Sequence, residues 1–584
     1  MGSFNIALTP MKSRFPKPST LNLQPSTFCP PSSYLCPNQL PHMNIEANKN
    51  EDSLKMAWSQ VRQKLEKIYE GGGKKSAEKQ KEKNKLVARE RIAYLCDDGM
   101  PFIEIGAFAG YEMYAEQGGC PAGGTVAGVG YISGRQCIIV ANDQTVKAGA
   151  WFPITGKKNL RLQEIAMENH LPIIYIVDSA GVFLPMQDEI FPDKENFGRI
   201  FRNNARMSAM GITQIAVVTG ACVAGGAYLP IMSDETIMVE GAGSIFLAGP
   251  YLVKAAIGED TDAETLGGAV THTEISGIAD YKFKTEQECL DKVKSIMSKL
   301  GATADAGFNR TAAQLPRLNK GEIFTMLSEG NGKPYDMLTL LECIIDENSF
   351  DEFKADYGKT IVCGYARVDG WAVGIVANQR LIVKSAKGEM QLGGVIYNDS
   401  ADKAARFIMN CNQKKIPLVF LQDVTGFMVG SRSEHSGIIK DGAKLVNAVA
   451  NSVVPKITII IGNSYGAGNY AMCGKAYDPR FIYAWPSAKI AVMGGEQAAK
   501  TMLQIQVAGM KAKGKEVSEA EEKEILEKIT ADYTRQTKPE YAAARLWVDA
   551  IINPADTRML ISEGISAANH NPDMETFSTG VLQV

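Results

Sequence analysis

Two stretches of the chain share one pattern: residues 173–181 read Ile-Ile-Tyr-Ile-Val-Asp-Ser-Ala-Gly, and residues 418–426 read Leu-Val-Phe-Leu-Gln-Asp-Val-Thr-Gly. In both, an apolar run follows a proline, passes through an aspartate and ends on a glycine. Near-continuous apolar runs of this length are typical of strands that are buried on both faces of a sheet. We therefore expect an α/β fold with two related halves.

The repeat extends to both sides of these stretches. Cys-Ile-Ile-Val-Ala-Asn at 137–142 matches Val-Gly-Ile-Val-Ala-Asn at 373–378, and the glycine-rich stretch 219–226 matches 462–468. The copies lie much further apart than the repeats of a solenoid. The sequence thus predicts two tandem domains of one fold, which could bring two substrates together.

The chain divides into four predicted regions, which are a disordered leader over 1–50, a first domain over 51–310, a second domain over 311–560 and a C-terminal tail over 561–584. Residues 51–100 are charged and helix-like, with a break at 71–73. Charged helical periodicity predicts a further exposed helix over 511–533. Strands are predicted at 173–179, 214–220, 236–241, 418–424, 456–462 and 481–485.

The composition excludes several classes of protein. With 584 residues the chain is too long for one core, and 45% hydrophobic with 22% charged residues is typical of a globular protein. The formal charge of −3 argues against a nucleic-acid binder. No apolar run reaches the roughly 18 residues that a transmembrane helix needs. We expect neither nucleic-acid nor membrane partners.

The eleven cysteines are scattered and include no Cys-x-x-Cys pair. This pattern indicates a reducing compartment and buried thiols rather than disulfides. Since the paired spacing of zinc ligands is missing, we predict no metal site.

The first 42 residues differ from the rest, because they contain no Asp or Glu and eight prolines. Their basic residues are Lys12, Arg14 and Lys17. Proline at this density opposes the amphipathic helix of a transit peptide. We favour a disordered leader of a cytoplasmic protein; the alternative is a transit peptide and a location in the mitochondrial matrix.

Common enzyme motifs do not fit the sequence. The glycines of 128–134 have one residue too many for a dinucleotide fingerprint, and Phe353 occupies the glycine position of a P-loop. His435 is the best candidate for a histidine base, but no Ser or Cys nucleophile stands beside it in the sequence.

Glycines recur instead where buried strands end. Small residues at these points allow a ligand to approach backbone N–H groups, which can stabilise an oxyanion. The alternative is that the glycines only permit tight helix–strand packing. Because matching glycines occur in both copies, we favour the oxyanion role.

Long blocks of the sequence resemble the carboxyltransferase subunits of biotin-dependent acyl-CoA carboxylases. The resemblance covers nearly everything from residue 52 to 560 and points to 3-methylcrotonoyl-CoA carboxylase within this family. The blocks that carry it are 71–75, 89–92, 141–147, 183–192, 197–201, 246–250, 426–430, 440–444, 465–470 and 492–499.

The resemblance implies a crotonase-like fold in both domains, with acyl-CoA on the first and biotin on the second. It also implies an active site between two subunits, so that a dimer is the smallest working unit of a complex with six such chains. No biotinylation sequence or ATP-binding loop is present, so a partner must carry the biotin carboxylase and the biotin. The reaction would move CO2 from carboxybiotin to an acyl-CoA, as in leucine degradation.

Residue roles are carried over from the same resemblance. The expected oxyanion donors are Ala180, Gly181, Ala467 and Gly468. The expected acyl-CoA contacts are Lys147, Phe183, Leu184, Gly225, Gly226 and Tyr228. The expected biotin contacts are Thr425, Gly426, Phe427, Gly466 and Tyr470.

Two departures leave the acyl group open. The family's Ser-Gly-Gly-Ala reads Ser-Ala-Gly-Val at 179–182, and the segment 380–400 is longer than expected. Propionyl-CoA is therefore an alternative substrate. A carboxyltransferase of the glutaconyl-CoA decarboxylase type, and a catalytically silent crotonase-like assembly subunit, are the rival functions.

Overall fold

The computed structural model describes residues 45–327, 334–385 and 388–582. Most of the predicted leader lies outside these ranges. Its last residues, 45–50, belong to the first turns of helix α1 (Ile45–Tyr69).

The first half contains an eight-stranded sheet with the order β1-β2-β3-β4-β5-β6-β8, and β7 pairs with β5. Its first three strands are antiparallel and the others are parallel. The strands are β1 (Ile103–Glu104), β2 (Thr125–Ile132), β3 (Arg135–Asn142), β4 (Ile173–Ser179), β5 (Gln214–Val223), β6 (Glu235–Val239), β7 (Ser244–Phe246) and β8 (Tyr281–Phe283).

The second half repeats this topology, with the order β20-β18-β17-β15-β11-β10-β9 and β19 paired with β17. Its strands are β9 (Asp351–Glu352), β10 (Ile361–Val368), β11 (Trp371–Asn378), β15 (Leu418–Val424), β17 (Lys456–Tyr465), β18 (Phe481–Ala484), β19 (Lys489–Ala491) and β20 (Ala550–Ile551). Small pairs are formed by β12 (Val383–Lys384) with β13 (Met390–Gln391), and by β14 (Val395–Ile396) with β16 (Gly426–Phe427). The prediction of two related α/β domains is confirmed.

Helices surround the two sheets, and the longer ones that contact them bury apolar residues. The N-terminal helices α1, α2 (Lys74–Glu82) and α3 (Ala88–Leu95) confirm the predicted break at 71–73. Those of the first half are α4 (Pro153–Asn169), α5 (Phe197–Ala209), α6 (Tyr228–Ile231), α7 (Pro250–Ile257), α8 (Ala263–Gly267) and α9 (Glu286–Met297). Those that follow are α10 (Ile323–Met326), α11 (Met337–Leu341), α12 (Asn398–Gln413), α13 (Ser431–His435), α14 (Ile438–Ala450), α15 (Gly466–Ala471), α18 (Pro539–Ala544) and α19 (Thr557–Asn569).

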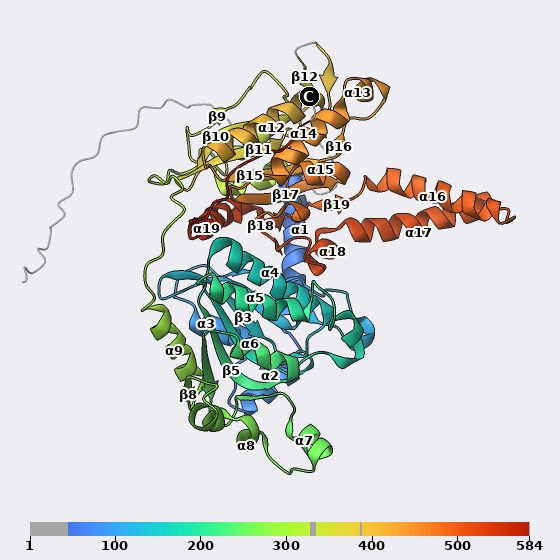
Figure 1. Ribbon diagram of the computed structural model, residues 1–584. Helices are drawn as coiled ribbons and strands as arrows, with labels where there is room; N and C mark the ends of the chain where they lie inside the picture. Colours follow the sequence, from blue (N-terminus) through green and yellow to red (C-terminus); the bar gives the residue numbers. More distant parts are fainter. Residues whose placement is uncertain (1–44, 328–333, 386–387, 583–584) are drawn as a thin grey trace, which may run out of the picture. The chain divides into compact units, whose positions relative to one another are not determined.

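The helix predicted over 511–533 is wrong in its bounds. The structure has two antiparallel helices there, α16 (Gly495–Ala512) and α17 (Glu519–Thr537) (Figure 1). Gly514 adopts a φ of +77° between them, and Ser518 caps α17 by accepting a hydrogen bond from the Glu521 N–H. The glycine and the capping box were the signals for the break.

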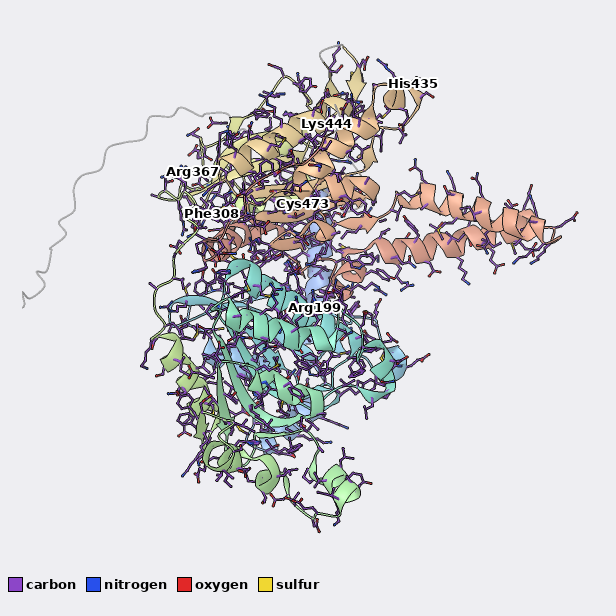
Figure 2. The ribbon with its side chains drawn as sticks, in the orientation of Figure 1. Arg199, Phe308, Arg367, His435, Lys444 and Cys473 are labelled. Atoms are coloured by element: carbon purple, nitrogen blue, oxygen red, sulfur yellow. The ribbon has the colours of Figure 1, made fainter. Side chains whose placement is uncertain are left out.

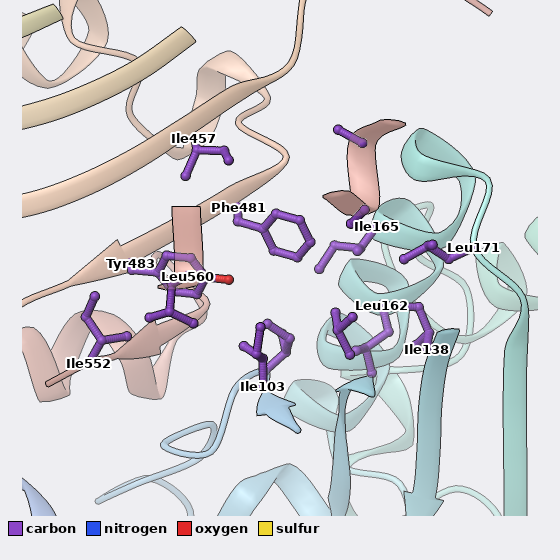
Figure 3. Close-up of a cluster of buried hydrophobic side chains, with 14 of the residues drawn as sticks. Ile103, Ile138, Leu162, Ile165, Leu171, Ile457, Phe481, Tyr483, Ile552 and Leu560 are labelled. Carbon is purple, nitrogen blue, oxygen red and sulfur yellow. The ribbon is translucent and has the colours of Figure 1, made fainter. Parts of the chain in front are cut away.

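One hydrophobic core joins the two halves. Figure 3 shows Ile103 and Ile165 of the first half in the same cluster as Phe481 and Leu560 of the second. The predicted boundary at residue 560 falls inside α19, whose apolar face is buried in this core. Residues 561–569 therefore belong to the folded core rather than to a tail.

A buried ion pair also crosses between the halves. Arg161 on α4 donates two hydrogen bonds of 2.9 Å to the carboxylate of Asp549, which is fully buried. Lys475 lies 3.4 Å from the same carboxylate. Burial alone would raise the pKa of Asp549, but the two cations lower it to about 2.

The described cysteines are free thiols, and all of them except Cys96 are buried. Burial raises the pKa of Cys120 to about 12, so this thiol stays protonated at neutral pH. The prediction of buried thiols is confirmed for this part of the chain.

Candidate active site

The first candidate site lies where β4 and β5 end. Gly181 follows β4 with a φ of +88°, a conformation that favours glycine. Gly226 lies in the 3-10 turn η5 (Ala224–Ala227), which follows β5. A Cβ atom on Gly226 would lie 3.9 Å from the Cα atom of Gly181. The two main chains thus face each other across a narrow gap.

The second half repeats this gap. Gly426 follows β15 with a φ of +135°, and Gly468 is the third residue of α15 after β17. A Cβ atom on Gly468 would lie 3.4 Å from the Cα atom of Gly426. Each half therefore pairs a glycine after one strand with a glycine at the next helical turn.

Two backbone N–H groups beside these gaps are already bonded. The Ala180 N–H donates to the Ala148 carbonyl at 3.0 Å, and the Thr425 N–H donates to the Gly394 carbonyl at 2.8 Å. These equivalent bonds fix the loops that precede Gly181 and Gly426. In this conformation Ala180 does not offer the N–H donor that the sequence prediction assigned to it.

The other predicted donors are better placed. The Gly181 N–H contacts the Ser179 Oγ at 3.1 Å, a neutral acceptor that an anionic oxygen would outcompete. Ala467 and Gly468 lie in the first turn of α15, where N–H groups have no acceptor within the helix. In each gap, one glycine follows a strand and the other lies at the start of a helical turn. The sequence analysis instead expected the N–H donors of each site on two consecutive residues.

The predicted acyl-CoA contacts lie around the first gap. Leu184 and Tyr228 expose 76% and 47% of their surface, which leaves them free to contact a ligand. Phe183 is partly buried. A Cβ atom on Gly225 would lie 2.5 Å from the Phe197 ring, so this glycine has a packing role.

The predicted biotin contacts lie around the second gap. Thr425 is exposed, and Tyr470 exposes 48% of its surface. Phe427 packs on α14, because a Cβ atom on Gly442 would lie 2.9 Å from its ring. Gly466 begins α15 with a φ of +52°. Roles in binding stay predictions for all of these residues.

A basic cavity of about 810 Å³ begins beside the first gap, at Lys147 and Ala148. Helix α2 contributes Lys79 and Lys83 to its wall, together with one acidic residue, Glu82. The sequence prediction included Lys147 but missed these two lysines individually. Their signal was the basic stretch 74–91, which suggests a docking surface for a polyanion.

A cavity of about 670 Å³ lies beside the second gap and has the opposite charge. Its wall includes Met428 and Val429, which follow the gap directly. Its acidic residues are Asp356, Glu389, Asp399, Asp402 and Asp441, against the two cations Lys359 and Arg432. Burial raises the pKa of Tyr357 in the same wall, and Asp402, Asp399 and Asp441 add to this rise.

His435 is exposed on α13 and does not line this cavity (Figure 2). Among the described residues, no group of His, Cys, Asp or Glu side chains is arranged to hold a metal ion. The described helices include none that is long and apolar enough to span a bilayer.

Residues 79–579 match the family model of the carboxyl transferase domain, so the chain belongs to this family. It is 46% identical over 555 residues to the probable mitochondrial methylcrotonoyl-CoA carboxylase beta chain of Drosophila melanogaster, covering 92% of this chain and 93% of the relative. It is also 46% identical over 526 residues to the biotin-dependent 3-methylcrotonyl-coenzyme A carboxylase beta1 subunit of Mycobacterium tuberculosis, covering 90% and 96%.

A solved structure extends this similarity to the fold. The beta subunit of the geranyl-CoA carboxylase of P. aeruginosa superposes with a TM-score of 0.79 at 35% identity, covering 94% of this chain and 99% of that one. The identification of a carboxyltransferase subunit from the sequence blocks is therefore confirmed.

Proposed function

We propose that the protein transfers a carboxyl group from carboxybiotin to 3-methylcrotonoyl-CoA, giving 3-methylglutaconyl-CoA. The observation that carries this proposal is that each half contains a gap in which two glycines face each other. The acyl group is supported by 46% identity to methylcrotonoyl-CoA carboxylase subunits, against 36% to a putative propionyl-CoA carboxylase beta chain.

The first gap suits a thioester. Backbone N–H groups at Gly181 and Gly226 would donate to the thioester oxygen as negative charge develops on it, which acidifies the carbon to be carboxylated. Leu184 and Tyr228 would contact the acyl chain. The bulk of the catalysis then comes from orientation and oxyanion stabilisation.

The second gap suits the ureido group of biotin. The glycines leave room for a flat polar group between Gly426 and the first turn of α15. There the N–H groups of Ala467 and Gly468 would stabilise the charge on the ureido oxygen. When bound, carboxybiotin supplies both the carboxyl group and the base. Because the cofactor supplies the base, the proposed active site needs no histidine base.

The basic cavity suits the phosphates of coenzyme A. Lys79, Lys83 and Lys147 are exposed on its walls, and lysine ammonium groups bind phosphate as point charges. The cavity begins at Ala148, next to the first gap. An acyl-CoA would then lie with its phosphates on α2 and its thioester at Gly181.

The working protein would be a complex. We propose a dimer as its smallest unit, six copies in the full assembly, and a partner that carries biotin and the biotin carboxylase. Three relatives are named as mitochondrial proteins, which supports the mitochondrial matrix and a transit peptide in residues 1–42 over a cytoplasmic location.

The decisive experiment is an acyl-CoA panel with the partner complex and labelled bicarbonate. Incorporation with 3-methylcrotonoyl-CoA in preference to all other thioesters is expected. A preference for propionyl-CoA would refute only the proposed identity of the acyl substrate. Binding of CoA without any carboxyl exchange would refute the proposed enzymatic activity and support the rival function of a catalytically silent assembly subunit.

A further inference from the structure

A buried aspartate lies directly behind each glycine gap. Asp178 is the penultimate residue of β4, and Asp423 is the penultimate residue of β15. Asp178 is fully buried, and Asp423 is 5% exposed. Neither residue has a part in the reaction proposed above, although both stand three residues before the glycine of their gap.

Both aspartates lie at a bulge in the sheet. The register of β4 against β5 shifts between Val177 and Ser179, and that of β15 against β17 shifts between Gln422 and Val424. The residue at each shift is the aspartate. Because a bulge bends its strand, it re-aims the residues that follow, here Gly181 and Gly426.

The neighbouring strand makes room for each carboxylate with a further glycine. A Cβ atom on Gly220 would lie 1.9 Å from the Asp178 Oδ1, and a Cβ atom on Gly462 would lie 2.5 Å from the Asp423 carboxyl carbon. The aspartate N–H is held as well, by Asn142 at 3.4 Å in the first half and by Asn378 at 3.1 Å in the second.

The cations that hold the two carboxylates come from unrelated parts of the chain. In the first half, Lys85 binds the Asp178 Oδ2, and Arg91 lies 3.4 Å from the same atom. Arg91 is itself fixed by two hydrogen bonds of 2.8 and 2.9 Å to Glu286. The bulge is thus tied to α3 and α9.

In the second half, Arg380 lies 3.2 Å from the Asp423 Oδ2, and the Tyr335 hydroxyl donates to that oxygen at 3.2 Å. The Asn463 N–H donates to the Oδ1 at 2.8 Å. Burial raises the pKa of Asp423, and the Arg380 guanidinium opposes this rise. Since donors surround the carboxylate, an amide in its place would leave an N–H group without an acceptor.

We infer that Asp178 and Asp423 are positioning residues: each anchors the bulge that aims the N–H donors of its gap at the developing oxyanion. The inference rests on the proposed function of the two gaps. It assigns one anchor to each half of the reaction, Asp178 to the thioester and Asp423 to the ureido group.

The test uses Asp178→Asn and Asp423→Asn in the complex with its biotin-bearing partner. Each substitution should lower kcat for carboxylation by about 10- to 100-fold, because displacing donors by about 1 Å has effects of this size. The KM for acyl-CoA should change less than about two-fold, since the lost interaction forms in the transition state.

A half-reaction separates positioning from simple destabilisation. Loss of CO2 from free carboxybiotin without acyl-CoA uses the second gap alone. Asp423→Asn should slow it by about 10-fold or more, whereas Asp178→Asn should leave it unchanged. Asp549→Asn is the matched control, because it removes a buried, ion-paired aspartate far from both bulges in the sequence and should leave kcat intact.

The outcomes are distinguishable. If the wild-type complex carboxylates no acyl-CoA, the proposed function fails. If it is active and both aspartate variants keep the wild-type kcat, or both slow the half-reaction equally, the positioning roles are refuted. Should Asp178→Asn or Asp423→Asn not fold, Lys85→Met and Tyr335→Phe weaken the same anchors and should give the same split between the two assays.

Discussion

The two halves share a backbone but differ in what surrounds it. In both, a bulged strand and the next helical turn bring two glycines together. Beside the first pair lies a cavity with lysines from α2, and beside the second a cavity with mostly acidic residues. In the proposed reaction, the shared backbone would supply N–H donors for an oxyanion, and the segments around it would decide which ligand binds.

The largest effect is expected from the glycines, and it should differ between the halves. A Cβ atom on Gly468 would lie 2.6 Å from Val424, whereas one on Gly226 would meet only Gly181 at 3.9 Å. Gly468→Ala should therefore lower kcat by about 100-fold and Gly226→Ala by less than about 10-fold. Carboxylation kinetics measure both, and equal losses would mean that the two gaps tolerate an added Cβ atom equally, against this prediction.

The next largest effect concerns the contact between the halves. Asp549→Asn leaves the buried Arg161 with only the partly exposed Glu164 as an anionic partner, which should lower the free energy of unfolding by about 3 kcal/mol. Urea titration measures this, with the exposed Asp98→Asn as control. If the two halves unfolded separately, the variant would shift only one of two transitions.

The same pair should make stability depend on pH. Because the pKa of Asp549 is lowered from 3.8 to about 2 in the folded protein, its contribution is present above about pH 4 and is lost as the pH falls towards 2. The difference in unfolding free energy between wild type and Asp549→Asn should shrink by about 2 kcal/mol over this window. A difference that stays constant would mean that Asp549 is not ionised in the folded state.

The smallest effect is expected at the basic cavity. Replacing Lys79, Lys83 and Lys147 together by alanine should raise the KM for acyl-CoA by about 10-fold with little change in kcat, because exposed charge pairs each contribute about 0.5 kcal/mol. Added salt should raise the wild-type KM towards that of the variant. Lys359→Ala in the acidic cavity is the control, and an equal rise in KM there would refute the assignment of the basic cavity to CoA.

Much of this architecture could be predicted from local patterns. The strands at 173–179 and 418–424 were predicted with their observed bounds, because apolar runs between a proline and a glycine mark buried strands clearly. The glycines of the gaps were found in the same way. The pairing of Gly181 with Gly226 was not, since it depends on the register of β4 against β5.

The anchors and the basic cavity also depend on long-range contacts. Asp178 looks like any aspartate at a strand end until Lys85 and Arg91 fold against it from another part of the chain. Lys79 and Lys83 become a cavity wall only when α2 packs near Lys147. Local sequence patterns contain no information about such approaches.

The shared core has a consequence for how this enzyme can be divided. Ile165 and Phe481 belong to one cluster, so neither half can cover its apolar face alone (Figure 3). Two fragments cut within 301–327 should thus fail to fold separately yet recombine when expressed together. The chain, a tandem repeat by its sequence, would then behave as a split enzyme, whose activity reports the association of its two fragments.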